Sequence, residues 1–200
     1  MRDADRPSEV RRVHLDSAKL QCLAHPLRSR LLSALRLEGP ATSAKLAQRL
    51  GTNTGATSYH LRQLADVGLV AEDPDRGTAR ERWWRAAHDM TSWSDADFED
   101  DPDDRAANEW LLGSIHRQKA LWRDDWLVTR NDWPRAWREA ATTTDLRLRL
   151  TPSQLAAFKD EVWALVERYE QAPPDPAPDD EPTEDVLVLL DAFPAREVRL

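Results

Sequence analysis

The sequence predicts a mainly helical α+β fold with small sheets, divided into two parts. Three observations carry this prediction. Apolar residues recur every three or four positions through much of residues 17–67 and again after residue 105, which is the period of an amphipathic helix. Two short strand-like runs flank a turn-forming stretch at residues 73–77, a pattern typical of a hairpin. An acidic stretch at residues 89–104 separates the two parts.

The chain has 200 residues and a net charge of -8, but the charge is unevenly distributed. Residues 1–90 contain 15 Lys and Arg against 11 Asp and Glu, which gives +4, whereas residues 91–200 contain 13 against 25, which gives -12. Attraction to phosphate depends on the local charge. The first half is therefore compatible with a nucleic-acid partner.

The single cysteine excludes an intramolecular disulfide and a Cys-rich zinc site. The chain contains neither an apolar run of about 18 residues nor the apolar core of a signal peptide. We therefore expect a cytoplasmic protein with no membrane partner. Residues 1–14 are polar, and we expect them to be disordered.

The most informative pattern lies in residues 41–70. Ser43–Leu50 and residues 54–67 each place apolar side chains on one face of a helix. Between them, Gly51 suits a left-handed helix end, and Thr52 or Asn53 can cap the second helix. Two helices joined by a tight glycine turn predict a helix-turn-helix.

Helices upstream and a hairpin downstream extend this motif. Asp16 can cap a helix over residues 17–23, and Pro26 suits the first turn of the next helix. Residues 69–71 and 78–86 are expected to be the two strands of a hairpin around the turn at 73–77. A hairpin directly after the second helix of the motif predicts a winged helix over residues 15–88.

Several motifs occur in the order and at the spacing found in ArsR-type winged-helix regulators: Leu23–Leu32, Leu46–Gly51, Ser58–Leu64 and Gly68–Val70. The strand Arg80–Trp84 resembles an actinobacterial branch of these proteins. The resemblance implies a homodimer whose second motif helix reads the major groove of double-stranded DNA. It thus implies a sequence-specific transcriptional regulator, and we expect a repressor.

The candidate DNA contacts are small, hydrogen-bonding or cationic residues on the motif and the wing. The N-terminus of the second helix suits phosphate, its outer face can reach base edges, and the wing can meet the backbone or the minor groove. An ordinary surface helix is the plainer alternative, but the hairpin that follows disfavours it. His60 could contact a base or be partly buried. The candidates are Lys45, Gln48, Thr52, Asn53, Thr54, Ser58, Tyr59, Arg62, Arg76, Arg80 and Arg82.

After an acidic linker at 89–104, residues 105–200 are expected to form a helical domain for dimerisation and effector binding. Helices are expected over residues 105–129 and 131–140 and from Thr151, where Gln154 completes a capping box. Residues 145–150 alternate strictly and residues 185–193 are almost all apolar. We expect these two runs to pair as strands, bridging the Pro-rich stretch 171–184.

Tryptophans in this second part suit a dimer or domain core, or a pocket for a small-molecule effector: Trp110, Trp122, Trp126, Trp133 and Trp137. We expect no metal, because the helix Ser43–Arg49 lacks the Cys pair of the thiolate sensors that the resemblance suggests. Cys22 and His25 fit a core residue and a helix start better than half a metal site.

The chain has no catalytic motif: no Gly-rich phosphate loop, no Gly-x-Ser-x-Gly and no His-Glu-x-x-His. We therefore expect no enzyme and no cofactor. Two alternatives to a simple DNA-binding regulator stay open. One is a winged-helix module for protein interaction, and the other is a regulator gated by a small molecule in the Trp-rich part.

Overall fold

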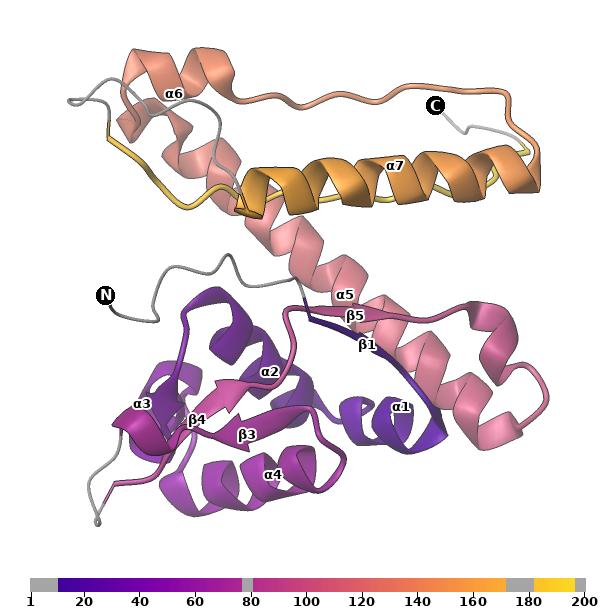
Figure 1. The fold of residues 1–200 in the computed structure, drawn as a ribbon. Helices are drawn as coiled ribbons and strands as arrows, with labels where there is room; N and C mark the ends of the chain where they lie inside the picture. Colours follow the sequence, from indigo (N-terminus) through magenta and orange to yellow (C-terminus); the bar gives the residue numbers. More distant parts are fainter. Residues whose placement is uncertain (1–10, 77–80, 172–181, 197–200) are drawn as a thin grey trace, which may run out of the picture. The chain divides into compact units, whose positions relative to one another are not determined.

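The computed structural model describes residues 11–76, 81–171 and 182–196. The chain is mainly α-helical with small sheets, which confirms the predicted fold class (Figure 1). It divides into two compact units, one from Val10 to Leu121 and one that includes Trp122–Leu200. We call them the N-terminal unit and the C-terminal unit. Within the described residues, no helix is long and apolar enough to cross a membrane.

Four helices begin the N-terminal unit: α1 (Ser17–Leu23), α2 (Pro26–Leu37), α3 (Ser43–Leu50) and α4 (Thr54–Asp66). Each starts after a residue whose side chain accepts a hydrogen bond from a backbone N–H of the first turn, as helix N-caps do; these residues are Asp16, His25, Thr42 and Asn53. Helix α4 contacts both α2 and α3. The helices enclose one core that includes the fully buried Leu20, Leu31, Leu46, Leu61 and Leu64.

The turn between α3 and α4 depends on Gly51. Its φ of 64° lies in the left-handed region, which a residue with a Cβ adopts at a cost. There the backbone N–H of Thr52 donates to the carbonyl of Ala47 at 2.9 Å, which closes the end of α3. Asn53 then starts α4. The helix-turn-helix geometry therefore follows from these neighbouring residues.

A three-stranded antiparallel sheet completes the wing. Its strands β2 (Ala41–Thr42), β3 (Val70–Glu72) and β4 (Trp83–Ala86) lie in the order β2-β4-β3. The short helix η1 (Pro74–Arg76) begins the connection from β3 to β4. The hairpin is present as predicted, with a second strand that starts later than residue 78. Residues 77–80 of the expected hairpin lie outside the described residues.

A second small sheet differs from the sequence-based expectation. Strand β1 (Arg12–His14) pairs in parallel with β5 (Met90–Ser92), as Figure 1 shows. Residues 12–14 are thus ordered, although we expected residues 1–14 to be disordered. A parallel partner 78 residues away along the chain, Met90 opposite Arg12, leaves no local pattern in the sequence.

Residues 89–104 also differ from the expected solvated linker. They contain β5, the short helix η2 (Asp95–Phe98) and the start of α5 (Pro102–Thr129). Phe98 is 4% exposed and belongs to the core of the N-terminal unit. Most of the acidic side chains stay exposed, and Asp101 accepts hydrogen bonds from the backbone N–H groups of Asp103 and Asp104. Dense charge is thus compatible with one buried aromatic ring.

The first half of α5 packs into the N-terminal unit through Ala107 and Leu111. Asp104 is also buried there, and its Oδ1 accepts hydrogen bonds from Ser17 Oγ and Gln21 Nε2, each at 2.7 Å. These bonds compensate the carboxylate for the lost water. From Trp122 onward, α5 belongs to the C-terminal unit.

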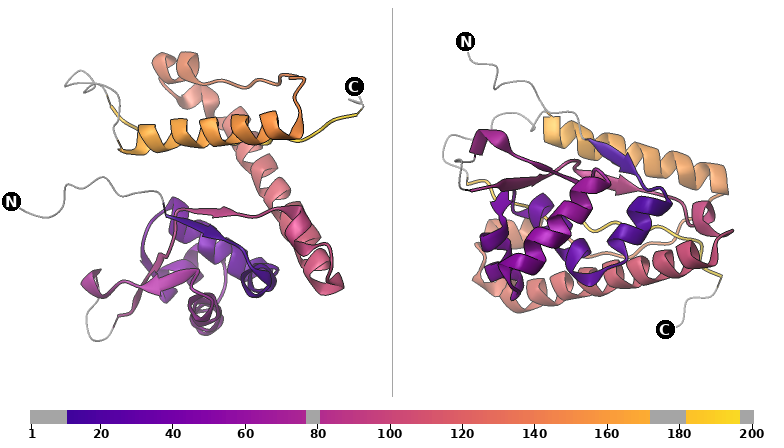
Figure 2. Two further views of the ribbon diagram at one scale, coloured as in Figure 1. Left: turned by 45° about the vertical axis from the view of Figure 1, so that its right-hand side comes forward. Right: turned by 90° about the horizontal axis from the view of Figure 1, so that it is seen from below.

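The C-terminal unit contains the end of α5, the short helix η3 (Arg130–Asp132), α6 (Arg135–Ala140) and α7 (Pro152–Gln171) (Figure 2). The predicted capping box before α7 is confirmed. The Thr151 N–H donates to Gln154 Oε1 at 2.8 Å, and the Gln154 N–H donates to Thr151 Oγ1 at 3.3 Å. Two of the unpaired donors at this helix start are thereby satisfied.

The predicted strand pair in this unit is wrong. Residues 145–150 and the segment 185–193 have no strand structure and do not pair with each other. Alternation of apolar residues favours a strand only where a neighbouring backbone supplies hydrogen bonds, and neither run supplies them to the other. Their apolar side chains are exposed instead, with Leu146 and Val186 each 70% exposed. Residues 172–181 of the expected Pro-rich linker lie outside the described residues.

Candidate nucleic-acid interface

Helix α4 has one buried and one exposed face. Thr57, Leu61 and Leu64 are completely buried and anchor the helix to the core. The other face carries Thr54, Gly55, Tyr59 and Arg62, which are exposed, and Ser58, which is half-buried. Tyr59 is 54% exposed although it is a large aromatic residue. The predicted contact residues of this helix therefore share a surface that a DNA groove could reach.

Arg62 is the cation of this face. Among the described residues, no carboxylate forms an ion pair or hydrogen bond with its guanidinium. A planar guanidinium with five N–H donors suits the O6 and N7 atoms of guanine or a phosphate. The side chain of Arg62 is thus exposed, charged and available for such a contact.

At the start of α4, Asn53 has a structural role. Its Oδ1 accepts a hydrogen bond from the Ala56 N–H at 2.8 Å, so this oxygen is used by the cap. Thr52 is half-buried. A Cβ added to Gly55 would come within 3.3 Å of Asn53 Oδ1, so a larger residue there would press on the cap. A phosphate would meet this end of the helix through backbone N–H groups rather than through the Asn53 oxygen.

Helix α3 and the wing are joined by Lys45 and Trp83. The Lys45 Nζ lies 4.5 Å from the centre of the Trp83 ring, a cation–π distance. Trp83 and Trp84 are neighbours in β4, so their side chains point to opposite faces, and Trp84 is buried at 3% exposure. Trp83 contacts Lys45 of the same domain, a partner that sequence reasoning missed. Gln48, the other predicted contact of α3, is exposed.

The arginines of the wing are held by neighbouring carboxylates. Arg82 Nη1 lies 2.9 Å from Glu72 Oε1 across the hairpin, and Arg76 Nε lies 3.5 Å from Asp73 Oδ2. Arg80 lies outside the described residues. Exposed ion pairs of this kind contribute about 1 kcal/mol or less, so a phosphate can compete for these side chains.

His60 does not belong to the exposed face. Its ring stacks on that of His25 with 4.4 Å between ring centres, and its Nδ1 is buried without a hydrogen-bond partner in the described part of the chain. Burial, followed by repulsion from His25, lowers the pKa of His60. Of the two roles considered for His60, the structure supports the partly buried one.

Cys22 and His25 occupy the roles that the sequence favours for them. Cys22 is a buried free thiol whose Sγ lies 3.5 Å from the Gln63 carbonyl oxygen, and burial raises its pKa. His25 starts α2, since its Nδ1 accepts a hydrogen bond from the Leu27 N–H at 3.2 Å. Burial also lowers the pKa of His25. Both residues therefore have structural partners within the domain.

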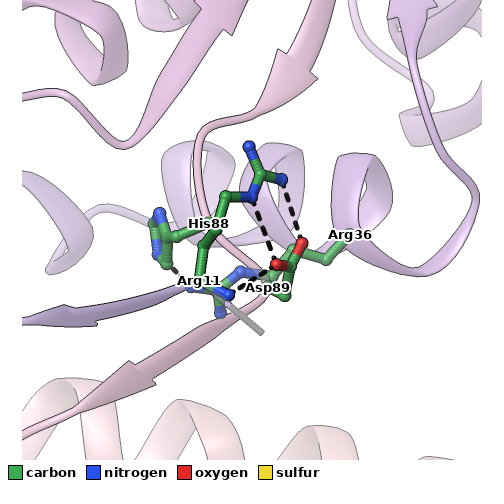
Figure 3. Close-up of polar contacts among 4 residues, drawn as sticks. All are labelled: Arg11, Arg36, His88 and Asp89. Atoms are coloured by element: carbon green, nitrogen blue, oxygen red, sulfur yellow. Dashed lines mark hydrogen bonds and ion pairs between the residues drawn. The ribbon is translucent and has the colours of Figure 1, made fainter. Parts of the chain in front are cut away.

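A polar cluster around the buried His88 lies where β4 leads into β5, and its Arg11–Asp89 ion pair is exposed (Figure 3). Arg11 holds Asp89 with three hydrogen bonds, at 2.8 Å from its backbone and at 3.0 and 3.2 Å from its guanidinium. Arg36 reaches from α2 to His88 and Thr91. Burial and the Arg36 charge lower the pKa of His88 to about 4. The cluster links the second sheet to α2.

The five tryptophans proposed for a core or a pocket are divided between the two units. Trp110 is partly buried against the core of the N-terminal unit. Trp122, Trp126, Trp133 and Trp137 belong to the C-terminal unit and are each half-buried. Of these, Trp133 and Trp137 make a ring contact, edge to face, with 6.2 Å between ring centres.

Comparison with known proteins points to the same part of the chain. Residues 23–73 match the family model of a helix-turn-helix domain. No curated protein matches the chain.

Among solved structures, the chain is similar to the homodimeric winged helix-turn-helix DNA-binding domain of Mb0332 from Mycobacterium bovis, a possible ArsR-family transcriptional regulator. The identity is 21% over 52% of this chain and 80% of that one, with a TM-score of 0.33. It is also similar to HlyU from Vibrio cholerae, with 22% identity over 50% and 84% and a TM-score of 0.32. A possible transcriptional regulator for arsenical resistance is 26% identical over 64% and 98%, with a TM-score of 0.31.

Proposed function

We propose that this chain, which carries an ArsR-like winged helix-turn-helix domain with residues 23–73 in the helix-turn-helix family, is a sequence-specific transcriptional repressor that binds double-stranded DNA as a homodimer. Helix α4 enters the major groove, and the wing meets the backbone or the minor groove. The exposed face of α4, with an unpaired Arg62 beside hydrogen-bonding residues, is the observation that carries this proposal.

Local charge supports the proposal. The first half of the sequence is basic although the whole chain is acidic, and α4 presents Arg62 on its exposed face. Lys45 and Arg82 lie on the elements next to α4 and are exposed as well. Such cations would release counterions from DNA, so binding should weaken steeply as the salt concentration rises.

The shape of the motif supports a dimer. A single short recognition helix contacts few base pairs, and proteins with this motif bind two half-sites about 34 Å apart with two copies. Two copies of α4 would then read a palindromic site. Repression would follow if the bound dimer blocks access to a promoter.

The experiment begins with selection of bound sequences from a random DNA pool by the full chain. Mobility shifts on the selected site then compare the natural chain with Arg62→Glu. We expect Arg62→Glu to weaken binding by about 10- to 100-fold, because a lost arginine contact costs roughly 1–3 kcal/mol. Arg138→Glu, an equal charge change at an exposed position of α6, should leave the affinity nearly unchanged.

Two outcomes would contradict the proposal. Selection of no sequence at low salt would favour the protein-interaction module instead. If the natural chain and Arg62→Glu bind DNA with equal affinity, α4 is not the helix that contacts the DNA.

A further inference from the structure

Two segments of the C-terminal unit are extended, apolar and unpaired. Residues 145–150 place Leu146, Leu148 and Leu150 at alternate positions, with exposures of 70%, 52% and 41%. Residues 185–189 include Val186, which is 70% exposed, and Val188, which is also 70% exposed. In the described part of the chain, neither segment takes part in a backbone hydrogen bond or a strand ladder. We call them the basic segment and the acidic segment.

The two segments complement each other in charge. The basic segment begins with Asp145 and carries Arg147 and Arg149 between its leucines, which leaves it net positive, whereas the acidic segment begins with Asp185 and follows Glu184. Oppositely charged residues on neighbouring strands stabilise a sheet, and like charges destabilise it. The partner that suits the basic segment is therefore an apolar strand with carboxylates at its end. The acidic segment has both features.

Pairing within one chain does not occur in the structure, although both segments lie in the same unit. Along the chain, α7, a helix of 20 residues, lies between them. A second copy of the chain supplies the same two segments. In a two-fold dimer the basic segment of each copy can meet the acidic segment of the other, which gives two equal ladders.

We infer that the basic segment of one copy pairs with the acidic segment of a second copy, and that this exchange holds the homodimer together. The inference deepens the proposed function, because it rests on the homodimer and names its interface. It removes both exposed apolar segments from water and satisfies their free backbone groups, as strand addition does at sheet edges.

The test uses two full-length variants with opposite charge reversals. One is Arg147→Glu with Arg149→Glu, and the other is Glu184→Lys with Asp185→Lys. Alone, each variant would place like charges opposite each other in both ladders. Mixed, the two variants restore opposite charges in both ladders of the heterodimer. Sedimentation velocity over a range of concentrations gives the dimer dissociation constant for each sample.

We expect each variant alone to dimerise more weakly by about tenfold or more, since the opposite-charge pair becomes a like-charge pair in both ladders at once. We expect the equimolar mixture to regain the natural affinity to within about threefold. Recovery on mixing distinguishes exchange between copies from pairing within a chain, which mixing cannot restore. Arg138→Glu with Lys159→Glu, an equal charge change outside both segments, should leave dimerisation unaltered.

Unchanged dimerisation of either variant, or failure of the mixture to recover, would overturn the inference. Circular dichroism of each variant confirms that the helices are intact, as expected for changes at exposed positions. The mobility shift with Arg62→Glu reads the proposed DNA contact separately. If Arg62→Glu loses DNA binding while the charge-reversal variants dimerise normally, the proposed dimer interface is contradicted and the proposed DNA-binding function is still supported.

Discussion

The two units bury apolar side chains to very different extents. Of the described residues, every buried hydrophobic side chain lies between Leu15 and Leu111, within the N-terminal unit. Large hydrophobic side chains that are exposed begin at Leu121, apart from Leu37 and Tyr59. The N-terminal unit thus has a core of its own, whereas the C-terminal unit leaves apolar area in water.

This difference indicates how the two units obtain stability. Burial of apolar surface is the dominant favourable contribution to folding, at roughly 25 cal/mol per Å². The N-terminal unit gains it within one chain. The C-terminal unit has a capped α7 but no buried hydrophobic side chain among its described residues. The proposed exchange with a second copy would cover its apolar segments. The following predictions compare matched residues from the two units.

Replacement of two phenylalanines by alanine should give the largest difference between the units in the free energy of unfolding. Phe98 is 4% exposed in the N-terminal unit, and Phe193 is 71% exposed in the C-terminal unit. Phe98→Ala should lower the free energy of unfolding by about 3–5 kcal/mol, because it removes a buried ring and leaves a cavity. Phe193→Ala should change it by less than about 0.5 kcal/mol in the monomer. Urea unfolding at low protein concentration measures both.

A small effect of Phe98→Ala would mean that residues 89–104 are a solvated linker after all. A large effect of Phe193→Ala in the monomer would mean that the C-terminal unit has a core of its own.

The free energy of unfolding should depend on pH mainly through His88, in the polar cluster of the N-terminal unit. The pKa of His88 falls from 6.5 in the unfolded chain to about 4 in the folded one. Below pH 6.5 the unfolded state binds a proton that the folded state does not, so stability is full above this pH and is lost as the pH falls toward 4. The loss amounts to about 3 kcal/mol.

Urea unfolding at several pH values between 7 and 4 measures this loss. His88→Gln should flatten the dependence, although His25 and His60 contribute in the same direction because their pKa values are also lowered. His116→Gln, at an exposed position of α5, serves as the control and should keep the natural slope. An identical slope in the natural chain and in His88→Gln would show that this histidine is not buried in the neutral form.

Two helix caps provide the smallest contrast. Asn53 caps α4 and Thr151 caps α7. Replacement of either by alanine should cost about 1 kcal/mol of unfolding free energy. Only Asn53→Ala should also weaken DNA binding, because it loosens the first turn of the proposed recognition helix. Mobility shifts on the selected DNA site measure both variants. If Thr151→Ala weakened binding as much as Asn53→Ala, the proposal that α4 is the recognition helix would be contradicted.

The helices were predictable because their signals are local. Asp16, Asn53 and Thr151 cap helices within three residues of their own position, and Gly51 ends α3 in the left-handed conformation. The exposure of Thr54, Tyr59 and Arg62 followed from the period of α4. The structure confirms that they are exposed, while their contacts with DNA stay a prediction.

The wrong predictions concern segments whose structure depends on a partner that is distant in the sequence. Strand β1 exists because β5 lies beside it, and Phe98 is buried because it joins the hydrophobic core of the N-terminal unit. Conversely, residues 145–150 have a strand-like pattern but no strand partner among the described residues.

The contact between Lys45 and Trp83 provides an intrinsic spectroscopic probe of DNA docking. The ammonium lies against one of the nine indole rings in the chain. If α3 rests on the DNA backbone as proposed, a phosphate would draw Lys45 off the ring and change the electric field there. In fluorotryptophan-labelled protein, one fluorine resonance should then move on titration with the selected DNA site, and Trp83→Phe would identify it by its absence.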